Sequence, residues 1–261
     1  MRHRIEDGPL TGGTANRGRV IRVGNTVHRP VGPHTPAVHA LLRYLTDTGF
    51  DAAPRVIRLA KRSEIVGYIE GTAATDPIAD WALTDGALLS VGALLRGYHA
   101  ACVGFDVGEW LWQRPVPRPW RGAIVTHNDL NPANVIFRDG RAVALIDFDL
   151  AAPGTVAFDL AVTACFWAPL RADDDIADSR RGRAVPRFRL LLDGYGADAE
   201  LRAEVVAATG AANRWIADVI EENANLGHPA FGRLWQDAMG LHHRASTWLS
   251  THADDLLDVS R

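Results

Sequence analysis

The sequence predicts an α+β protein of two lobes: a small N-terminal β-sheet with one helix, and a larger, mostly helical C-terminal lobe that carries a β-hairpin. Short β-prone runs separated by turn residues occupy much of positions 20–71, which favours a small sheet. The pair Asp139-Gly140 lies between two further β-prone runs, and this is a strong hairpin signal. Apolar residues then recur at helical spacing through much of the remaining chain.

We expect the N-terminal lobe at residues 1–71, with its first two strands at 20–23 and 26–29. The segment ahead of these strands is glycine-rich and contains Gly12, Gly13 and Thr14. Glycine lets backbone N–H groups approach an anion, so the segment has the composition of a phosphate-covering loop. Taken alone it is better explained as a plain loop, and only the catalytic segment described below favours the phosphate-binding interpretation.

A helix is expected at residues 35–49, because Pro36 suits a first helical turn and apolar residues follow at helical spacing. Strands follow at 56–59 and 64–71, and the second leads into a hinge. Residues 72–261 then form the C-terminal lobe. Its expected helices begin at the capping residue Thr84 and span roughly 203–224 and 231–249.

The hairpin fixes which polar residues meet at its open end. With a two-residue turn at Asp139-Gly140, Arg138 faces Arg141 and Asn134 faces Leu145. Asp147 then lies two residues beyond the position opposite Asn134.

Asp129 precedes this hairpin on a loop opened by His127, so Asp129, Asn134 and Asp147 are expected to converge. Two hard oxygen ligands beside a free carboxylate suit a Mg²⁺-bound phosphate and a hydroxyl group that is to be deprotonated. The alternative is an ordinary hairpin with polar ends.

Three segments of the chain resemble the aminoglycoside phosphotransferase family, whose members are relatives of protein kinases. Residues 127–134 match the catalytic loop H-x-D-x-x-x-x-N, and residues 146–151 match the segment I-D-[WF]-x-x-A. The downstream run Gly154-Thr155-Val156-Ala157-Phe158-Asp159-Leu160-Ala161 also looks like that family. The resemblance is specific only around residues 126–161, and it implies a two-lobed protein-kinase-like fold.

The resemblance also implies roles for these residues. Asp129 is the expected catalytic base, and His127 is expected to brace its loop. Asn134 and Asp147 are expected to hold one or two Mg²⁺ ions on the phosphates of ATP or GTP. Asp149 is expected either to support the metal site or to act as a capping residue, and Asp159 is expected to be structural. The purine is expected against the backbone of Tyr68, Ile69 and Glu70.

The N-terminal lobe departs from the family pattern at the phosphate-binding lysine. Lys61 is the only lysine and lies too late in the lobe for that role. By position Arg29 is the substitute, with His28 as a weaker candidate, and arginine can bind phosphate bidentately. Residues 35–49 also lack the glutamate that pairs with this lysine in the family, so either another carboxylate orients Arg29 or nothing does.

The acceptor is expected to enter from the C-terminal lobe. In aminoglycoside-modifying relatives carboxylates hold the amines of the sugar, and the candidates here are Asp173, Asp174, Asp175, Glu221 and Glu222. The alternative for each is a solvated acidic surface, and arginines in the loop that holds the three aspartates argue against a simple polycation trap.

Composition limits the partners. A net charge of −3 does not favour nucleic acid, and no apolar run is long enough to span a membrane. The two cysteines, Cys102 and Cys165, lie in apolar surroundings, which suggests free thiols in a reducing bacterial cytoplasm.

The sequence therefore favours a Mg²⁺-dependent O-phosphotransferase that moves the γ-phosphate of ATP or GTP to a hydroxyl of a small molecule. An aminoglycoside or another antibiotic would fit as acceptor, in resistance or self-protection. The alternative is a catalytically degenerate binding or immunity protein on a kinase scaffold, because the N-terminal pattern also looks like bacterial proteins described as trifolitoxin-immunity-like. The identity of the acceptor, the choice between ATP and GTP, and the oligomeric state stay open.

Overall fold

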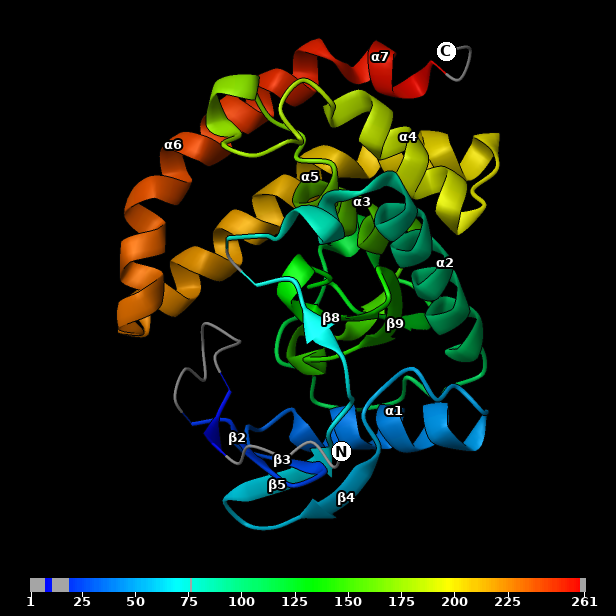
Figure 1. Ribbon diagram of the computed structural model, residues 1–261, viewed down its shortest axis with the longest axis vertical. Coiled ribbons are helices and arrows are strands. Elements are labelled where there is room, and N and C mark those ends of the chain that lie inside the picture. Colours follow the sequence, from blue (N-terminus) through cyan, green and yellow to red (C-terminus); the bar gives the residue numbers. More distant parts are fainter. Residues whose placement is uncertain (1–7, 11–18, 76, 259–261) are drawn as a thin grey trace.

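The structure is a computed structural model, and it describes residues 8–10, 19–75 and 77–258. It has the two-lobed protein-kinase-like architecture expected from the sequence. Figure 1 shows the N-terminal sheet and helix α1 (Thr35–Asp47) at one end, the long helices at the other, and the hairpin β8–β9 between them. Gly12, Gly13 and Thr14, expected in a phosphate-covering loop, lie outside the described residues.

The N-terminal lobe is built on a five-stranded antiparallel sheet with the order β1-β2-β3-β5-β4. Its strands are β1 (Gly8–Pro9), β2 (Ile21–Val23), β3 (Thr26–Pro30), β4 (Val56–Leu59) and β5 (Ser63–Gly67). In this register Arg29 on β3 lies directly opposite Glu64 on β5. Helix α1 begins with a proline in its first turn, as expected, and buries Val38, Leu41 and Leu45.

The strand expected at 64–71 is shorter than predicted. It ends at Gly67, after which the Tyr68 N–H donates to the Asn25 carbonyl at 2.9 Å and the chain leaves the sheet. Residues Thr72–Ala73 form a separate strand, β6, which pairs with β8 of the C-terminal hairpin. The boundary at residue 71 stays a prediction.

The hairpin consists of β8 (Val135–Arg138) and β9 (Arg141–Leu145), with Arg138 opposite Arg141 as expected. The expected pairing of Asn134 with Leu145 is wrong by one residue. A register shift between Ile136 and Phe137 places Val135 opposite Leu145, because β9 contains an extra residue there. The Asn134 carbonyl therefore accepts from the Ile146 N–H at 3.0 Å, and Asp147 lies one residue nearer to Asn134 than the regular register would place it.

Helices make up most of the rest of the C-terminal lobe. They are α2 (Asp85–Ala101), α3 (Val156–Trp167), α4 (Ala184–Tyr195), α5 (Ala199–Asn225), α6 (Pro229–Thr251) and α7 (Ala253–Leu257). Thr84 caps α2, accepting from the Ala87 N–H at 3.2 Å, as the sequence predicts. A short antiparallel pair, β7 (Ile124–Thr126) with β10 (Ala152–Gly154), flanks the hairpin. Within the described part of the chain, no helix is both long and apolar enough to cross a bilayer.

Candidate active site

The loop that follows β7 is held by one buried carboxylate from α3. Both oxygens of Asp159 accept backbone N–H groups at 2.8 Å, Oδ2 from His127 and Oδ1 from Asn128. Oδ2 also receives Nε2 of His99 at 2.9 Å. Burial would raise the pKa of Asp159, but the hydrogen bond and charge of His99 and the groups of His127 lower it below its usual value. Asp159 thus fixes the backbone of the loop that carries Asp129.

His127 ties this loop to the hairpin. Its ring is buried, and Nε2 donates to the carbonyl of Ile146, the residue before Asp147, at 3.0 Å. Burial lowers the pKa of His127. The ring does not line the cleft described below, so its position suits a brace between loop and hairpin.

Asp129 is held by two amides. Its Oδ1 accepts from Asn131 Nδ2 at 3.0 Å, and its Oδ2 accepts from Asn134 Nδ2 at 2.9 Å. Burial raises the pKa of Asp129 to about 8, with the charge of Asp147 adding to the effect and the two amides opposing it. The raised pKa makes the ionised form of Asp129 a stronger base than an exposed carboxylate, as general-base catalysis requires.

Asp147 has left-handed backbone geometry, with φ of 62°. Non-glycine residues rarely adopt this conformation, and here it follows directly on the hairpin. Asn128, beside Asp129, is also left-handed, with φ of 59°. Two strained positions therefore lie on the loops that carry the two carboxylates, as is common at functional sites.

Arg29 joins the N-terminal sheet to this centre. Its Nε donates to Glu64 Oε1 at 2.6 Å, Nη1 to Asp147 Oδ1 at 3.2 Å and Nη2 to Asp149 Oδ1 at 2.8 Å. Burial would lower the pKa of Arg29, but the charges of Asp149, Asp147 and Glu64 raise it, so the guanidinium remains charged. Arg29 occupies the position that the sequence assigns to it. His28 does not share that position, because neighbouring strand residues face opposite sides and its Nε2 instead contacts Thr26 Oγ1 at 3.0 Å.

A carboxylate does orient Arg29, and it comes from β5. Glu64 is buried, and its second oxygen, Oε2, is hydrogen-bonded to Nε2 of His39 on α1. The chain Arg29–Glu64–His39 thus connects sheet and helix without a helix glutamate. Glu64 was not among the residues predicted from the sequence, because its position opposite Arg29 follows from the register of β3 and β5 in the folded sheet.

The carboxylates beside Arg29 titrate differently. Burial and the charge of Asp149 raise the pKa of Asp147, Arg29 opposes them, and the net result is a pKa of about 6. Burial also opposes ionisation of Asp149, but Arg29 and His34, whose Nε2 lies 3.5 Å from Asp149 Oδ1, hold its pKa below the usual value.

The oxygen donors fit a Mg²⁺ ion. The Asn134 amide nitrogen donates to the carbonyl and Oδ2 of Asp129, at 2.8 and 2.9 Å, which leaves its Oδ1 as a neutral ligand. Asp147 supplies a carboxylate nearby. The described residues contain no group of three or more His, Cys, Asp or Glu side chains that could hold a metal alone. Mg²⁺ is commonly bound by one or two carboxylates together with the phosphates of a substrate, and Asp147 with Asn134 would supply the ligands from the protein.

These residues line a cleft of about 500 Å³ between the lobes. Asp129, Asn134, Asp147 and Arg29 meet there, and Asp149 also contributes. Toward the N-terminal sheet the wall is apolar, as a purine slot requires, and includes Val20, Val27, Val66, Ile136 and Ile146.

The three residues expected at the purine edge are placed differently from one another. Tyr68 and Ile69 line the cleft, and the Tyr68 ring is covered by the Arg22 guanidinium at 3.5 Å. Glu70 is exposed outside it, and its carbonyl accepts from Arg138 Nε at 3.1 Å.

The acidic residues expected to hold an acceptor do not line this cleft. Asp174 pairs with Arg181 at 2.6 Å, Asp175 with Arg244 at 2.5 Å, and Asp173 accepts from the Gly182 N–H at 2.9 Å. These carboxylates are held by Arg181 of the same loop, by Arg244 of α6 and by a backbone N–H, which explains why their charge is not directed at the cleft.

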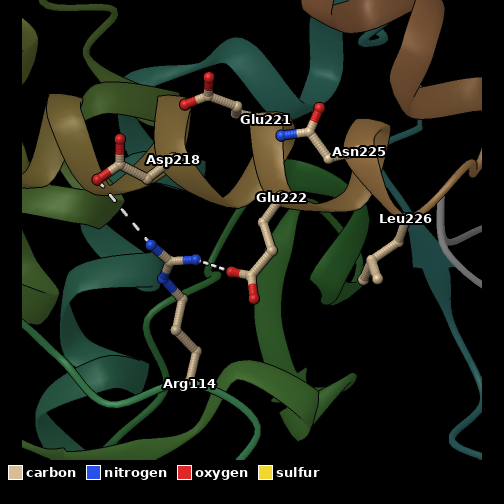
Figure 2. A pocket seen from close by; sticks show the side chains of 6 residues that line it. All are labelled: Arg114, Asp218, Glu221, Glu222, Asn225 and Leu226. Atoms are coloured by element: carbon tan, nitrogen blue, oxygen red, sulfur yellow. Dashed lines mark hydrogen bonds and ion pairs between the residues drawn. The ribbon is translucent and has the colours of Figure 1, made fainter.

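Glu221 and Glu222 lie beside a separate, shallow pocket on the outer side of α5. Figure 2 shows Arg114 between Asp218 and Glu222, with Glu221 pointing away from it.

Comparison with known proteins identifies relatives of this chain by sequence and by fold. Residues 104–201 match the model of the phosphotransferase enzyme family. The chain is 30% identical to a trifolitoxin immunity protein of Rhizobium leguminosarum bv. trifolii, over 95% of this chain and 96% of that protein.

Two solved structures share the fold. One is a choline/ethanolamine kinase family protein from Mesorhizobium loti, with a TM-score of 0.64 and 16% identity over 97% of this chain and 92% of that one. The other is the GDP complex of aminoglycoside 2'-phosphotransferase-IIIa, with a TM-score of 0.63 and 13% identity over 93% and 92% of the two chains. At these identities the structural likeness shows the fold alone, whereas the sequence matches identify the family. The chain belongs to the phosphotransferase enzyme family.

Proposed function

We propose that this protein is a Mg²⁺-dependent O-phosphotransferase that moves the γ-phosphoryl group of ATP or GTP to a hydroxyl of a small molecule. The observation that carries the proposal is the convergence of Arg29, Asp129, Asn134 and Asp147 in one cleft. Phosphoryl transfer requires mainly positioning and charge stabilisation, and this set supplies a cation for phosphate, a base and metal-binding oxygens.

Each residue then has one task. Arg29, held by Glu64, binds the phosphate oxygens of the nucleotide. Asp129 orients the acceptor hydroxyl and takes its proton as the oxygen bonds to the γ-phosphorus and the bond from that phosphorus to the β,γ-bridging oxygen breaks. Asn134 and Asp147 would hold one or two Mg²⁺ ions, which neutralise charge on the phosphates when bound. A role in resistance or self-protection against an antibiotic, in the bacterial cytoplasm, is part of the proposal.

Thermal stabilisation by nucleotide tests this proposal. A ligand that binds only the folded state raises stability by RT ln(1 + [L]/Kd), so millimolar ATP or GTP reveals even a weak site. We expect nucleotide to raise the melting temperature of the wild type only when Mg²⁺ is present. In Asp147→Asn we expect the effect of nucleotide to be the same with and without Mg²⁺. Equal melting temperatures with and without Mg²⁺-nucleotide would refute the proposal.

A second candidate is a binding or immunity protein without catalysis. The similarity to a trifolitoxin immunity protein over nearly the whole chain favours it, as does the arginine in place of lysine. Asp129, Asn134 and Asp147 all line one cleft, and Asn134 is hydrogen-bonded to Asp129, which argues for catalysis. The substitution Asp129→Asn distinguishes the two candidates. A binding protein without catalysis would still protect the cell against the antibiotic in that variant, whereas an enzyme would lose this protection.

A further inference from the structure

The cleft extends beyond Asp129 to a wall formed by residues of α3, α5 and α6. Figure 1 shows these helices in the C-terminal lobe. This acceptor wall consists of Phe166, Trp215, Ile216, Val219, Ile220, Phe231 and Leu234. Its only polar companions among the described lining residues away from the catalytic loop are Gln113 and Asn223. The charged side chains that line the cleft, Arg29, Asp129, Asp147 and Asp149, all belong to the catalytic centre.

Helix α5 is amphipathic in a way that directs its charge away from the cleft. The residues at positions 215, 216, 219, 220 and 223 share one face and line the cleft. Asp218, Glu221 and Asn225 lie on another side of the helix, beside the pocket of Figure 2, and Glu222 lies at the border between that side and the cleft face, next to Trp215.

Two of these carboxylates, Asp218 and Glu222, are also paired with arginines. Arg114 bonds to Glu222 and lies 3.9 Å from Asp218, and Arg214 lies 2.9 Å from Asp218. The Arg114 guanidinium is 4.8 Å from the centre of the Trp215 ring, so the same residue holds the acidic face and supports an aromatic side chain of the wall. The cleft face of this helix therefore offers a cationic acceptor no carboxylate.

From this arrangement we propose that the cleft binds an uncharged, largely apolar hydroxyl compound, and that it discriminates against polycationic sugars. The inference rests on the proposed phosphotransferase function and names its acceptor class. Placing an unpaired amine against Val219 and Ile220 would remove its hydration without a compensating partner, whereas an apolar acceptor gains from burial of its surface. Asn223 and Gln113 are available to orient a polar group of such a compound.

N-phenyl-1-naphthylamine, an uncharged aromatic dye that fluoresces when it enters apolar sites, is a direct probe. We expect it to bind with and without saturating Mg²⁺-ADP, and millimolar kanamycin, a polycationic sugar, to leave it bound. Val219→Asp places a carboxylate in the wall and should weaken dye binding about tenfold, equivalent to about 1.4 kcal/mol. Asn225→Asp adds the same charge to the outward face of the same helix and should change dye affinity by less than about twofold, which corresponds to a small fraction of that energy.

A near-isosteric pair guards against misfolding of Val219→Asp. Asn223→Asp and Asn225→Asp make the same change two positions apart, one on the cleft face and one on the outer face, so only the first should weaken dye binding. The proposal is overturned if kanamycin displaces the dye, if the dye does not bind, or if the cleft and outer variants behave alike. Dye binding sensitive to Val219→Asp in a protein that shows no Mg²⁺-nucleotide shift would instead uphold the apolar site and refute the phosphotransferase function.

Discussion

The substitution Glu64→Gln tests the unit that replaces the expected lysine and helix glutamate. Glu64 has 1% of its side chain exposed and contacts Arg29 through one oxygen and His39 through the other. Glutamine preserves shape but removes the charge, so Arg29 faces at most a neutral amide oxygen where its carboxylate partner lay at 2.6 Å. Breaking a buried ion pair by removing one partner costs about 3 to 5 kcal/mol. Because Arg29 retains Asp147 and Asp149, we expect the lower value, about 3 kcal/mol, for the loss in free energy of unfolding.

Urea unfolding measures this loss, and an exposed pair on the same lobe is the control. Arg55 and Asp51 form an ion pair at 2.7 Å with side chains 66% and 71% exposed, so Asp51→Asn should cost less than about 1 kcal/mol. In the double variant Arg29→Met/Glu64→Gln the two losses should be strongly non-additive, because each single variant already breaks the pair. Coupling between Arg29 and Glu64 would be refuted if the two losses in the free energy of unfolding were strictly additive. It would also be refuted if Glu64→Gln lost no more stability than Asp51→Asn.

Three further predictions concern the catalytic loop and its support. Asp129→Asn should lower turnover about 10³-fold, the range for removal of a general base, while the nucleotide dissociation constant from calorimetry stays near wild type. Arg29→Lys should weaken nucleotide binding despite restoring the family's lysine, because an ammonium cannot hold Glu64 and Asp149 at once in the fork geometry of Arg29; unchanged affinity would contradict this. Asp159→Asn should lower the free energy of unfolding by about 2 to 3 kcal/mol at neutral pH. The pKa of Asp159 is lower in the folded than in the unfolded protein, so its contribution to stability is present above the unfolded pKa of about 4 and is lost as the pH falls. A difference in the free energy of unfolding between wild type and Asp159→Asn that does not narrow in acid would contradict this role of Asp159.

Sequence reasoning placed the residues whose relations are local. The run from His127 to Asp147 contains loop, strand, turn and strand in continuous order, so alternation and the Asp139-Gly140 turn sufficed to bring Asp129, Asn134 and Asp147 together. The register error of one residue arose because an extra residue in β9 carries no distinctive sequence signal.

Longer relations were harder to predict. Glu64 lies 35 positions from Arg29 and 25 from His39, and the pairing depends on how β3 and β5 align in the folded sheet. Helix α3 is apolar on all sides because it is buried, so its 3.6-residue period is weak.

The acceptor wall shows a different limit. The helix expected at roughly 203–224 is present as α5, and its apolar residues Trp215, Ile216, Val219 and Ile220 line the cleft. An apolar helix face has the same pattern whether it covers a core or a ligand site. The acidic candidates failed to reach the cleft for a related reason, since a sequence does not show which arginines their side chains will pair with.

The most direct test of the phosphotransferase function is the release of inorganic phosphate from ATP and GTP without any added acceptor, because water can occupy the position of the hydroxyl. We predict slow, Mg²⁺-dependent release by the wild-type protein with at least one of the two nucleotides, reduced to background in Asp129→Asn. Release that is absent from the wild type with both nucleotides, or that persists unchanged in Asp129→Asn, would contradict the assignment of this cleft to phosphoryl transfer.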